Sequence, residues 1–235
     1  MKKLLFLPLA LIAMAFTVSN ENPNGCEGYW LVEKGITLEY KDYNSKDKLQ
    51  GSQLSSITEL VDVNGVLNVT LHSITKDDKD KVTSEGDYKF TCNNGEITID
   101  MKAAMESQGQ GMEEMEGMEV TIDQSNLVYP SKFEVGQTLP DGTMTMKVSS
   151  SGMVVMTMVT KITDRKVEAF ESVTTPAGTF ECVKMSQITH MDMGMMKSST
   201  KSIDWFTLGV GSVRHESYDK NGALEGYRVL TQVIK

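Results

Sequence analysis

The chain has 235 residues, of which 40% are hydrophobic and 23% charged, and its formal net charge at pH 7 is −9. This acidic balance excludes nucleic acid as a partner, because neutralising phosphates needs a basic patch, and it disfavours adsorption to anionic lipid surfaces. The length allows one sizeable hydrophobic core, as is common for a single β-rich domain.

The first 15 residues have the pattern of a secretory signal peptide. Lys2 and Lys3 precede an apolar stretch over residues 4–16, and Ala13-Met14-Ala15 offers an A-x-A cleavage site. We predict cleavage at about residues 15–20 and export to the periplasm or the cell exterior. The stretch is too short to span a bilayer, and no other stretch approaches the roughly 18 apolar residues of a membrane helix, so no membrane span is expected.

Beyond a polar segment at 16–25, expected to be a flexible tail, residues 26–235 are predicted to form a single β-rich domain. The dominant hydrophobic period is two, in short runs that turn-forming residues bound. The predicted strand segments lie at 35–43, 65–75, 86–92, 95–101, 127–133, 143–163, 165–175, 178–193, 197–206 and 211–235. The expected fold class is mainly β: a single curved antiparallel sheet or half-barrel with one or two short helices.

Two kinds of hairpin loop are visible in the sequence. Asn93-Asn94-Gly95 predicts a tight turn, because Gly tolerates the positive φ that such turns need. Residues 43–51 align with residues 218–226, and residues 74–86 form a third polar tip of the same kind. Asp77, Asp78 and Asp80 in that tip lack the Gly and Glu of a calcium-binding EF-hand loop, so a solvated turn is expected.

Export permits oxidation of the three cysteines, which allow at most one internal disulfide. A Cys26–Cys92 bond is preferred, because it would fasten the start of the domain to its first strands, but spacing leaves the pairing open. Cys182 lies in an apolar strand pattern and is expected to be a buried, inert thiol.

Residues 101–118 break the strand period. Met101 and Met105 are four residues apart, whereas Met112, Met115 and Met118 follow at intervals of three. This spacing predicts one or two short helical stretches with a methionine packing face.

Methionine is concentrated in one part of the chain, since all methionines other than Met1 and Met14 lie between residues 101 and 196. Residues two apart share one face of a strand, so Met144 pairs with Met146, and Met156 with Met158, and a turn at 150–152 brings the two pairs together. The same rule places Met191, Met193 and Met195 on one face and His190 on the other.

Three functions fit such a methionine-rich sheet face. The face could be a structural core that the segment 101–118 plugs. It could be a groove for a lipid, an acyl chain or the apolar segment of an envelope protein, because methionine adapts to variable shapes. It could also bind Cu(I) or Ag(I), which favour thioether ligands. The groove residues would be Met144, Met146, Met156, Met158, Met191, Met193 and Met195, and the metal ligands Met112, Met115, Met118, His190, Met191 and Met193.

No known catalytic or cofactor motif occurs in the chain. Nucleophile elbows, dinucleotide-binding and phosphate-binding glycine loops, H-E-x-x-H and C-x-x-C are all missing. His72, His190 and His215 each lie in a strand pattern, for which a structural role is expected. We therefore predict a non-catalytic protein without a cofactor, and the sequence indicates neither its ligand nor its oligomeric state.

Several stretches carry a family resemblance. They are Cys26-x-x-Tyr29-Trp30 with residues 33–51, the Pro-Ala-Gly-Thr-Phe strand opening within 172–184, and residues 205–227 with the final 229–235. These stretches resemble a secreted bacterial family called TapB-like, grouped near proteins with a domain of unknown function. The resemblance runs from about Cys26 to Lys235 and implies an exported β-rich domain with a curved sheet similar to that of periplasmic lipoprotein carriers. It brings no catalytic residue.

Overall fold

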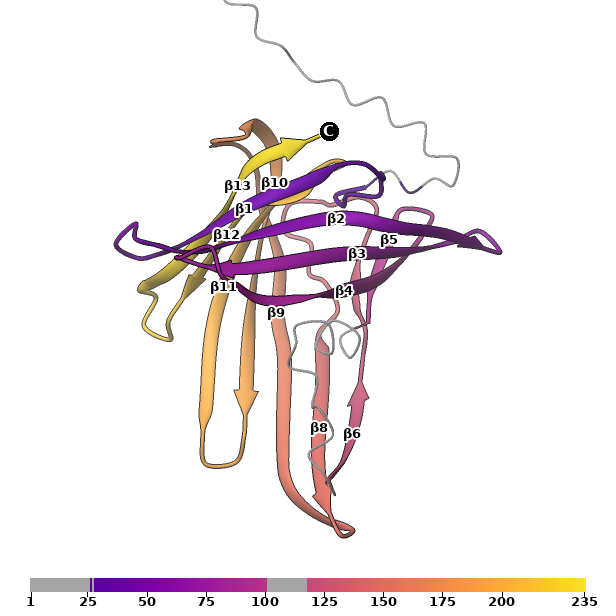
Figure 1. Ribbon diagram of the computed structural model, residues 1–235, viewed down its shortest axis with the longest axis vertical. Coiled ribbons are helices and arrows are strands. Elements are labelled where there is room, and N and C mark those ends of the chain that lie inside the picture. The colour runs from indigo at the N-terminus through magenta and orange to yellow at the C-terminus, as the bar shows by residue number, and fades with distance from the viewer. Residues whose placement is uncertain (1–25, 27, 101–117) are drawn as a thin grey trace, which may run out of the picture.

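The computed structural model describes Cys26, residues 28–100 and residues 118–235, and within these ranges it contains thirteen β-strands and no helix. The strands form one open sheet in the order β6-β8-β9-β10-β11-β12-β13-β1-β2-β3-β4-β5-β7, and neighbouring strands are antiparallel. The prediction of a mainly β protein with a single antiparallel sheet is confirmed (Figure 1). The strands are β1 (Thr37–Asn44), β2 (Leu49–Val63), β3 (Val66–Asp77), β4 (Val82–Asn93), β5 (Glu96–Ile99), β6 (Met118–Gln124), β7 (Leu127–Tyr129), β8 (Gly142–Ser150), β9 (Met153–Thr175), β10 (Gly178–Asp192), β11 (Lys197–Thr207), β12 (Gly211–Tyr218) and β13 (Leu224–Ile234).

The sheet curls so that its two edges approach each other. β6 and β7 follow one another in the chain, yet they form opposite edges of the sheet. Nε2 of Gln124, at the end of β6, donates a hydrogen bond of 2.6 Å to Oδ1 of Asp100, which follows β5. The two ends of the described chain meet in the middle of the sheet, where β1 pairs with β13. The result is a curved open sheet rather than a flat one.

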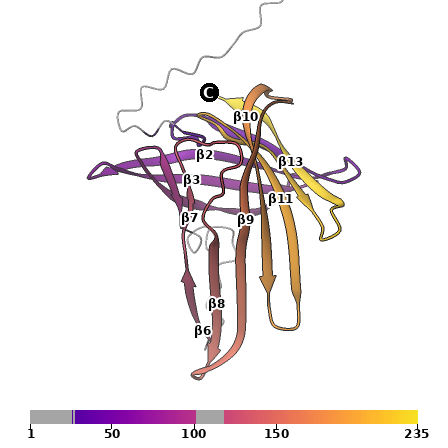
Figure 2. The ribbon, with the colours of Figure 1, turned by 180° about the vertical axis from the view of Figure 1, so that it is seen from behind.

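The sheet has two regions with different shapes (Figures 1 and 2). In the upper body, β1 to β4 cross the molecule and curve over β10 to β13. Below it, the β8–β9 and β10–β11 hairpins extend side by side toward the same end of the molecule. The length of β9, 23 residues, lets that strand belong to both regions.

The three polar hairpin tips share one structure. Oδ1 of Asn44 accepts backbone N–H groups two and four residues later, and Oδ1 of Asp77 and of Asp219 does the same. These backbone hydrogen bonds are the first cause that lowers the pKa of Asp77 and of Asp219. The Asp77 carboxylate thus organises its own turn, as a solvated loop does.

The repeated hairpin has glycines where the neighbouring strand comes too close to leave room for a Cβ atom. A Cβ at Gly51 would lie 2.3 Å from the carbonyl oxygen of Lys76, and one at Gly226 would lie 2.6 Å from that of Tyr43. The tight turns use positive φ instead: φ is 49° at Asn94 and 79° at Gly95, as the sequence predicts for this hairpin.

The segment before β1 lies inside the curved sheet and completes the core. Leu31 and Val32 are buried, and Trp30 packs against three aromatic rings from distant parts of the chain. Its ring centroid lies 5.7 Å from that of Phe90, 5.3 Å from that of Tyr129 and 5.8 Å from that of Phe206. Because these rings come from β4, β7 and β11, Trp30 connects both halves of the sheet.

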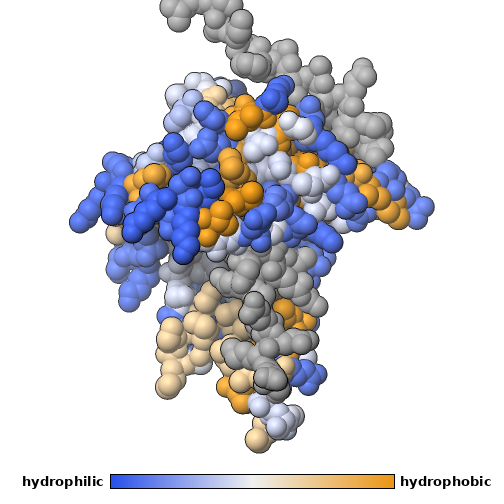
Figure 3. Space-filling model, in the orientation of Figure 1, coloured by the Kyte–Doolittle hydropathy of each residue, from blue (hydrophilic) through white to orange (hydrophobic). Residues whose placement is uncertain are grey.

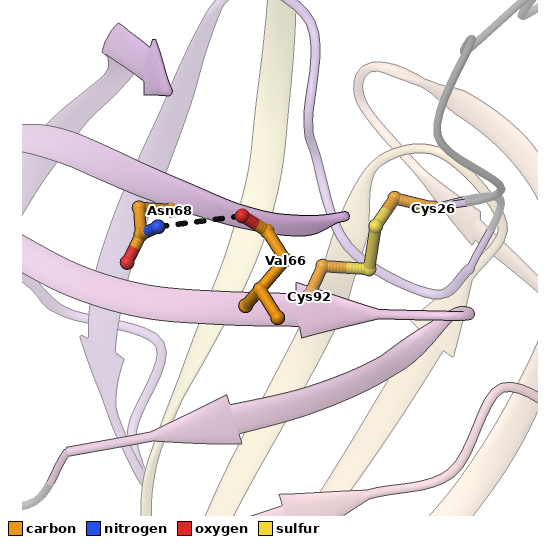
Figure 4. The surroundings of a disulfide bond; sticks show 4 residues. All are labelled: Cys26, Val66, Asn68 and Cys92. Carbon is orange, nitrogen blue, oxygen red and sulfur yellow. Dashed lines mark hydrogen bonds between the residues drawn. A yellow bond between two sulfur atoms is a disulfide. The ribbon is translucent and has the colours of Figure 1, made fainter. Parts of the chain in front are cut away.

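A disulfide anchors this segment. Cys26 and Cys92 are joined with an S–S distance of 2.13 Å, and both are buried (Figure 4). The bond connects the start of the described chain to β4, next to β3, where Asn68 Nδ2 donates to the carbonyl oxygen of Val66. It is the pairing that the sequence favoured without excluding the others. Cys182 is free and buried.

Several sequence predictions fall outside the described residues. The signal peptide at 1–15, the tail at 16–25 and most of the helical segment 101–118 belong to this group. Met118 is described, and it opens β6 instead of ending a helix. β2 (Leu49–Val63) was not predicted, because its serines and charged residues hide the alternation of apolar positions. A single domain over 26–235 remains a prediction.

The cysteine chemistry can be checked by thiol titration. In denaturant the oxidised chain should react with one equivalent of thiol reagent, from Cys182, and with three after reduction. In the native protein Cys182 should stay unreactive, because burial, followed by the charges of Glu181 and Glu171, raises its pKa to about 12. A native thiol that reacts readily near pH 8 would contradict this placement.

Replacing Cys26 and Cys92 together by serine should lower the free energy of unfolding by about 2–4 kcal/mol, because the bond restrains a long loop in the unfolded chain. The measurement is urea denaturation followed by circular dichroism. As a control, a reducing agent should shift the midpoint of the wild-type chain but not that of the double variant.

Candidate ligand cavity

The curved part of the sheet lines an open cavity of about 690 Å3. This volume falls within the roughly 300–1,000 Å3 of typical small-molecule sites. The aromatic group of Trp30, Phe90, Tyr129 and Phe206 forms one wall. The other lining side chains include Leu31, Leu38, Tyr40, Leu71 and Val210, and the polar Asp42, Gln53, Ser55, Gln187, Asp204, Ser212, His215, Ser217 and Arg228.

Strand alternation directs these side chains inward. Residues two apart share one face of a strand, as Gln53 and Ser55 do on β2 and His215 and Ser217 do on β12. We call the face that lines the cavity the inner face and the opposite one the outer face. Small polar residues at every second position of a strand are thus a sequence signal that one face of the strand lines a cavity.

Four polar residues form a row across the inner face. Asp204 on β11 lies opposite His215 on β12, His215 lies opposite Arg228 on β13, and Arg228 lies opposite Asp42 on β1. We call this set the polar row. Its two ends are ion pairs: Arg228 donates from Nε to Oδ1 of Asp42 at 2.7 Å and from Nη2 to Oδ2 at 3.1 Å, and Nδ1 of His215 lies 2.9 Å from Oδ1 of Asp204.

The polar row lies where the cavity meets solvent. The Arg228 and His215 side chains are 38% and 36% exposed, whereas the Asp204 side chain is only 15% exposed. Burial by itself lowers the pKa of His215, but the hydrogen bond and the negative charge of Asp204 outweigh burial, so the pKa lies above its ordinary value. A charged His215 would leave the row balanced, with two cations facing two carboxylates.

His215 also contacts a hydroxyl, which gives a serine–histidine–aspartate arrangement. Its Nε2 lies 3.1 Å from Oγ of Ser217, while Nδ1 faces Asp204. Acyl transfer by such a triad also needs N–H donors for the oxyanion. β12 is paired on both sides, with β11 and β13, so the backbone N–H groups around Ser217 belong to the ladders.

The deep side of the cavity has a polar acceptor and a buried cation nearby. Oε1 of Gln187 is buried on the wall and has no hydrogen-bond partner among the described residues. Arg165, which is 1% exposed, lies with its guanidinium carbon 4.6 Å from the ring centroid of Tyr129 and donates from Nη1 to the carbonyl oxygen of Pro140 at 2.6 Å. Arg165 thus supports the aromatic wall from behind. The sequence did not single out either residue.

The predicted methionine pairs lie on the inner face, below the cavity. Met146 on β8 is directly opposite Met158 on β9, and Met144 and Met191 both lie opposite Thr160. Met144 and Met146 are buried, Met158 and Met191 are half-buried, and Met156 is exposed. The inner face therefore continues from the aromatic cavity along β8, β9 and β10 as a thioether surface.

The placement of Met193 and Met195 on a shared strand face with Met191 is wrong. β10 ends at Asp192, and Gly194, with a φ of 79°, reverses the chain before β11 begins at Lys197. A glycine that can take positive φ made the turn here, where the methionine alternation had indicated a continuing strand.

The described residues do not assemble the predicted metal ligands. His190 is exposed and, by alternation, on the opposite face of β10 from Met191, while Met193 lies in the turn. Met112 and Met115 lie outside the described residues. In residues 26, 28–100 and 118–235, no group of three or more His, Cys, Asp or Glu side chains could hold a metal ion.

The two tryptophans lie on opposite faces. Trp205 is on the outer face, where its Nε1 donates to Oε1 of Glu171 at 2.6 Å and its ring lies 5.1 Å from Nζ of Lys184. That hydrogen bond is the first cause that lowers the pKa of Glu171. Trp30, in contrast, lines the cavity. Each face of the sheet thus carries one natural fluorophore.

Comparisons with known proteins place the fold but no activity. A model of the DUF3108-like family matches residues 33–230. A crystal structure from Bacteroides fragilis NCTC 9343, described as an exported protein with a YmcC-like fold, is 20% identical, with a TM-score of 0.69 over 89% of this chain and 100% of that one. A structure described as a lipoprotein from Parabacteroides distasonis ATCC 8503 is 24% identical, with a TM-score of 0.69 over 88% of this chain and 99% of that one. No curated protein matches the chain.

Within the described ranges, no helix is long and apolar enough to cross a membrane.

The raised pKa of His215 predicts a pH-dependent contribution to stability. A folded-state pKa above the unfolded value of about 6.5 stabilises the fold fully below that pH, and this contribution is lost as the pH rises through the folded-state value. The coupling between Asp204 and His215, measured by a double-mutant cycle of Asp204→Asn and His215→Gln, should therefore be larger near pH 6 than near pH 8.5. A coupling that does not change with pH would contradict it.

Proposed function

This chain belongs to the DUF3108-like family, and we propose that it is an exported, non-catalytic protein that binds the acyl chain of an amphiphile in the cavity of its curved sheet. The observation that carries the proposal is the cavity of about 690 Å3 beside an aromatic wall. Such a volume, with an aromatic wall beside polar and charged side chains, suits a site that holds a small amphiphile.

Export is supported by three independent features. The first 15 residues have a signal-peptide pattern, the chain carries a disulfide, and the two similar structures are described as an exported protein and a lipoprotein. The finer resemblance to TapB-like proteins and the choice between periplasm and cell exterior remain predictions.

The two ends of the cavity fit the two parts of an amphiphile. The Trp30 wall and Leu38, both apolar, would contact the chain. The polar row would face the head group, because Arg228 and His215 are partly exposed and can exchange contacts with water for contacts with a ligand. Gln187 adds an acceptor for a hydroxyl or amide donor.

Other sites on the described chain are less suited to this role. A hollow of about 820 Å3 near Lys161 and His190 is lined largely by charged and hydroxyl side chains, including Lys197 and Lys220. Nothing in the described residues favours the soft-metal alternative over a ligand cavity. The alternative in which residues 101–118 plug the methionine face lies mostly outside the described residues.

Two single-tryptophan variants test where a ligand binds. Dibromostearate, whose bromine atoms quench nearby indoles on contact, should quench Trp205→Phe, which retains only Trp30, and leave Trp30→Phe almost unchanged. The expected contrast follows from the opposite faces of the two rings. Unbrominated stearate should compete and restore the Trp30 emission. Equal quenching of both variants, or none, would rule out the cavity as the binding site.

Filling the cavity should block it. Leu71→Trp adds volume on the cavity wall, and we expect the affinity for stearate, measured by isothermal titration calorimetry, to fall by about tenfold or more. Ile74→Trp is the matched control, because Ile74 lies on the same strand but on the outer face and is also half-buried. Equal losses in both variants would indicate a general effect on folding.

The non-catalytic assignment can be tested with a chromogenic ester. The wild-type chain, incubated with p-nitrophenyl laurate, should release no more nitrophenolate than the Ser217→Ala variant does. The reason is that the backbone N–H groups around Ser217 are engaged in the strand ladders. Hydrolysis that Ser217→Ala abolishes would instead identify an esterase.

A further inference from the structure

The lower end of the molecule exposes apolar side chains on two hairpin tips. At the β8–β9 tip the four consecutive residues 153–156 (Met-Val-Val-Met) are between 41% and 70% exposed. At the β10–β11 tip Met195 is fully exposed and Met196 is 65% exposed. Figures 1 and 2 show both tips at the same end, away from the body.

The pattern at the β8–β9 tip indicates an apolar medium on both sides of the strand. A β-bulge interrupts the alternation at Val155, but the register still places Met153 and Met156 opposite Ser150 and Val148 on one face and Val154 opposite Ser149 on the other, so both faces of the tip are apolar. A protein groove or a second sheet would cover one face only. Lipid surrounds an inserted tip from all sides, and a protruding hairpin is the shape that can enter it.

The charges at this end nearly balance, although the whole chain has a net charge of −9. Residues 142–163 contain Lys147 and Lys161 and no acidic residue, while Glu119 and Asp123 of the neighbouring β6 lie opposite Ser149 and Thr145. At the other tip Lys197 pairs with Asp192 at 2.7 Å. In Figure 3 the part of the lower end that grey atoms leave visible is mostly hydrophobic with some hydrophilic residues, whereas hydrophilic residues are abundant on the upper body. The lysines can face lipid phosphates, while an acidic body favours a bilayer of low net charge.

We infer that the β8–β9 and β10–β11 tips dock the protein on the surface of a lipid bilayer, with their methionine and valine side chains inserted at the interface. Methionine suits this place, because its flexible thioether adapts to irregular acyl packing. The inner face runs from these tips through Met158 and Met191 to the cavity. In a docked molecule, one continuous surface would therefore lead from the membrane to the cavity. The docking itself does not depend on a ligand in the cavity.

The test is flotation of the chain, as recovered from the exported fraction, with vesicles of phosphatidylethanolamine and phosphatidylcholine and no added ligand. Wild-type protein should float with the vesicles. Combining Val154→Thr and Val155→Thr with Met195→Gln and Met196→Gln should lower the partition coefficient by about tenfold or more, because it removes apolar surface from both tips. All variants keep the same N-terminus, so any contribution from that end is equal.

The matched control is Val61→Thr with Val63→Thr, at the β2–β3 tip, which points in another direction (Figure 1). Val61 and Val63 are 42% and 51% exposed, close to the 57% of Val154 and Val155, so the same substitutions should leave flotation unchanged. A direct reading comes from Met195→Trp: after subtraction of the wild-type emission of Trp30 and Trp205, its spectrum should shift to the blue with vesicles, whereas the corresponding difference spectrum of Val63→Trp should not.

Three results would overturn the inference. The first is flotation of the four-residue tip variant at the wild-type level. The second is an equal loss in the β2–β3 control. The third is a tip-dependent dimer, seen by analytical ultracentrifugation without vesicles, together with no blue shift of Met195→Trp, since it would show that a second copy covers the tips. Quenching of Trp30 by dibromostearate should persist when the tip substitutions are made in the Trp205→Phe chain, which separates this test from that of the cavity.

Discussion

The packing of Trp30 inside the sheet is the interaction on which the rest of this structure depends. The concave side of a curved sheet has to be filled by side chains or by a ligand, because an empty space there loses dispersion contacts. Trp30 fills part of that space and contacts rings from β4, β7 and β11 at once. The disulfide between Cys26 and Cys92 holds the start of this segment against β4. The cavity is the part of the interior that the segment leaves open.

The polar row shows how an apolar interior can tolerate charge. Each member has a partner on the adjacent strand, so Arg228 and His215 are compensated by Asp42 and Asp204. Placing the row at the mouth of the cavity avoids most of the desolvation cost that a fully buried ion pair carries. The same arrangement places charged side chains next to the aromatic wall of one cavity, so that an amphiphile could meet both an apolar surface and paired charges.

One sheet face connects the two proposed activities. The inner face begins at the aromatic wall, continues along Met146 and Met158, and ends at the exposed hairpin tips. Along this path the side chains of the inner face change from rigid aromatic rings to methionines, whose flexible thioethers adapt to the shape of what they contact. Because Glu119 and Asp123 of the neighbouring β6 offset the lysines of 142–163, and Lys197 pairs with Asp192, the charges near the tips nearly balance, which suits a lipid bilayer of low net charge.

The sequence by itself determined the β class, the export pattern, the tight turn at Asn94-Gly95 and the shared faces of Met144 with Met146 and of Met156 with Met158, because these follow from local periodicity and turn chemistry. It did not indicate the cavity, since the rings and the polar row come from strands that only the pairing of β1 with β13 brings together. It placed Met193 and Met195 wrongly because one glycine turn ended β10 early. Tertiary structure alone decided which residues far apart in the chain share a face, since curvature and strand order are set by contacts between distant segments.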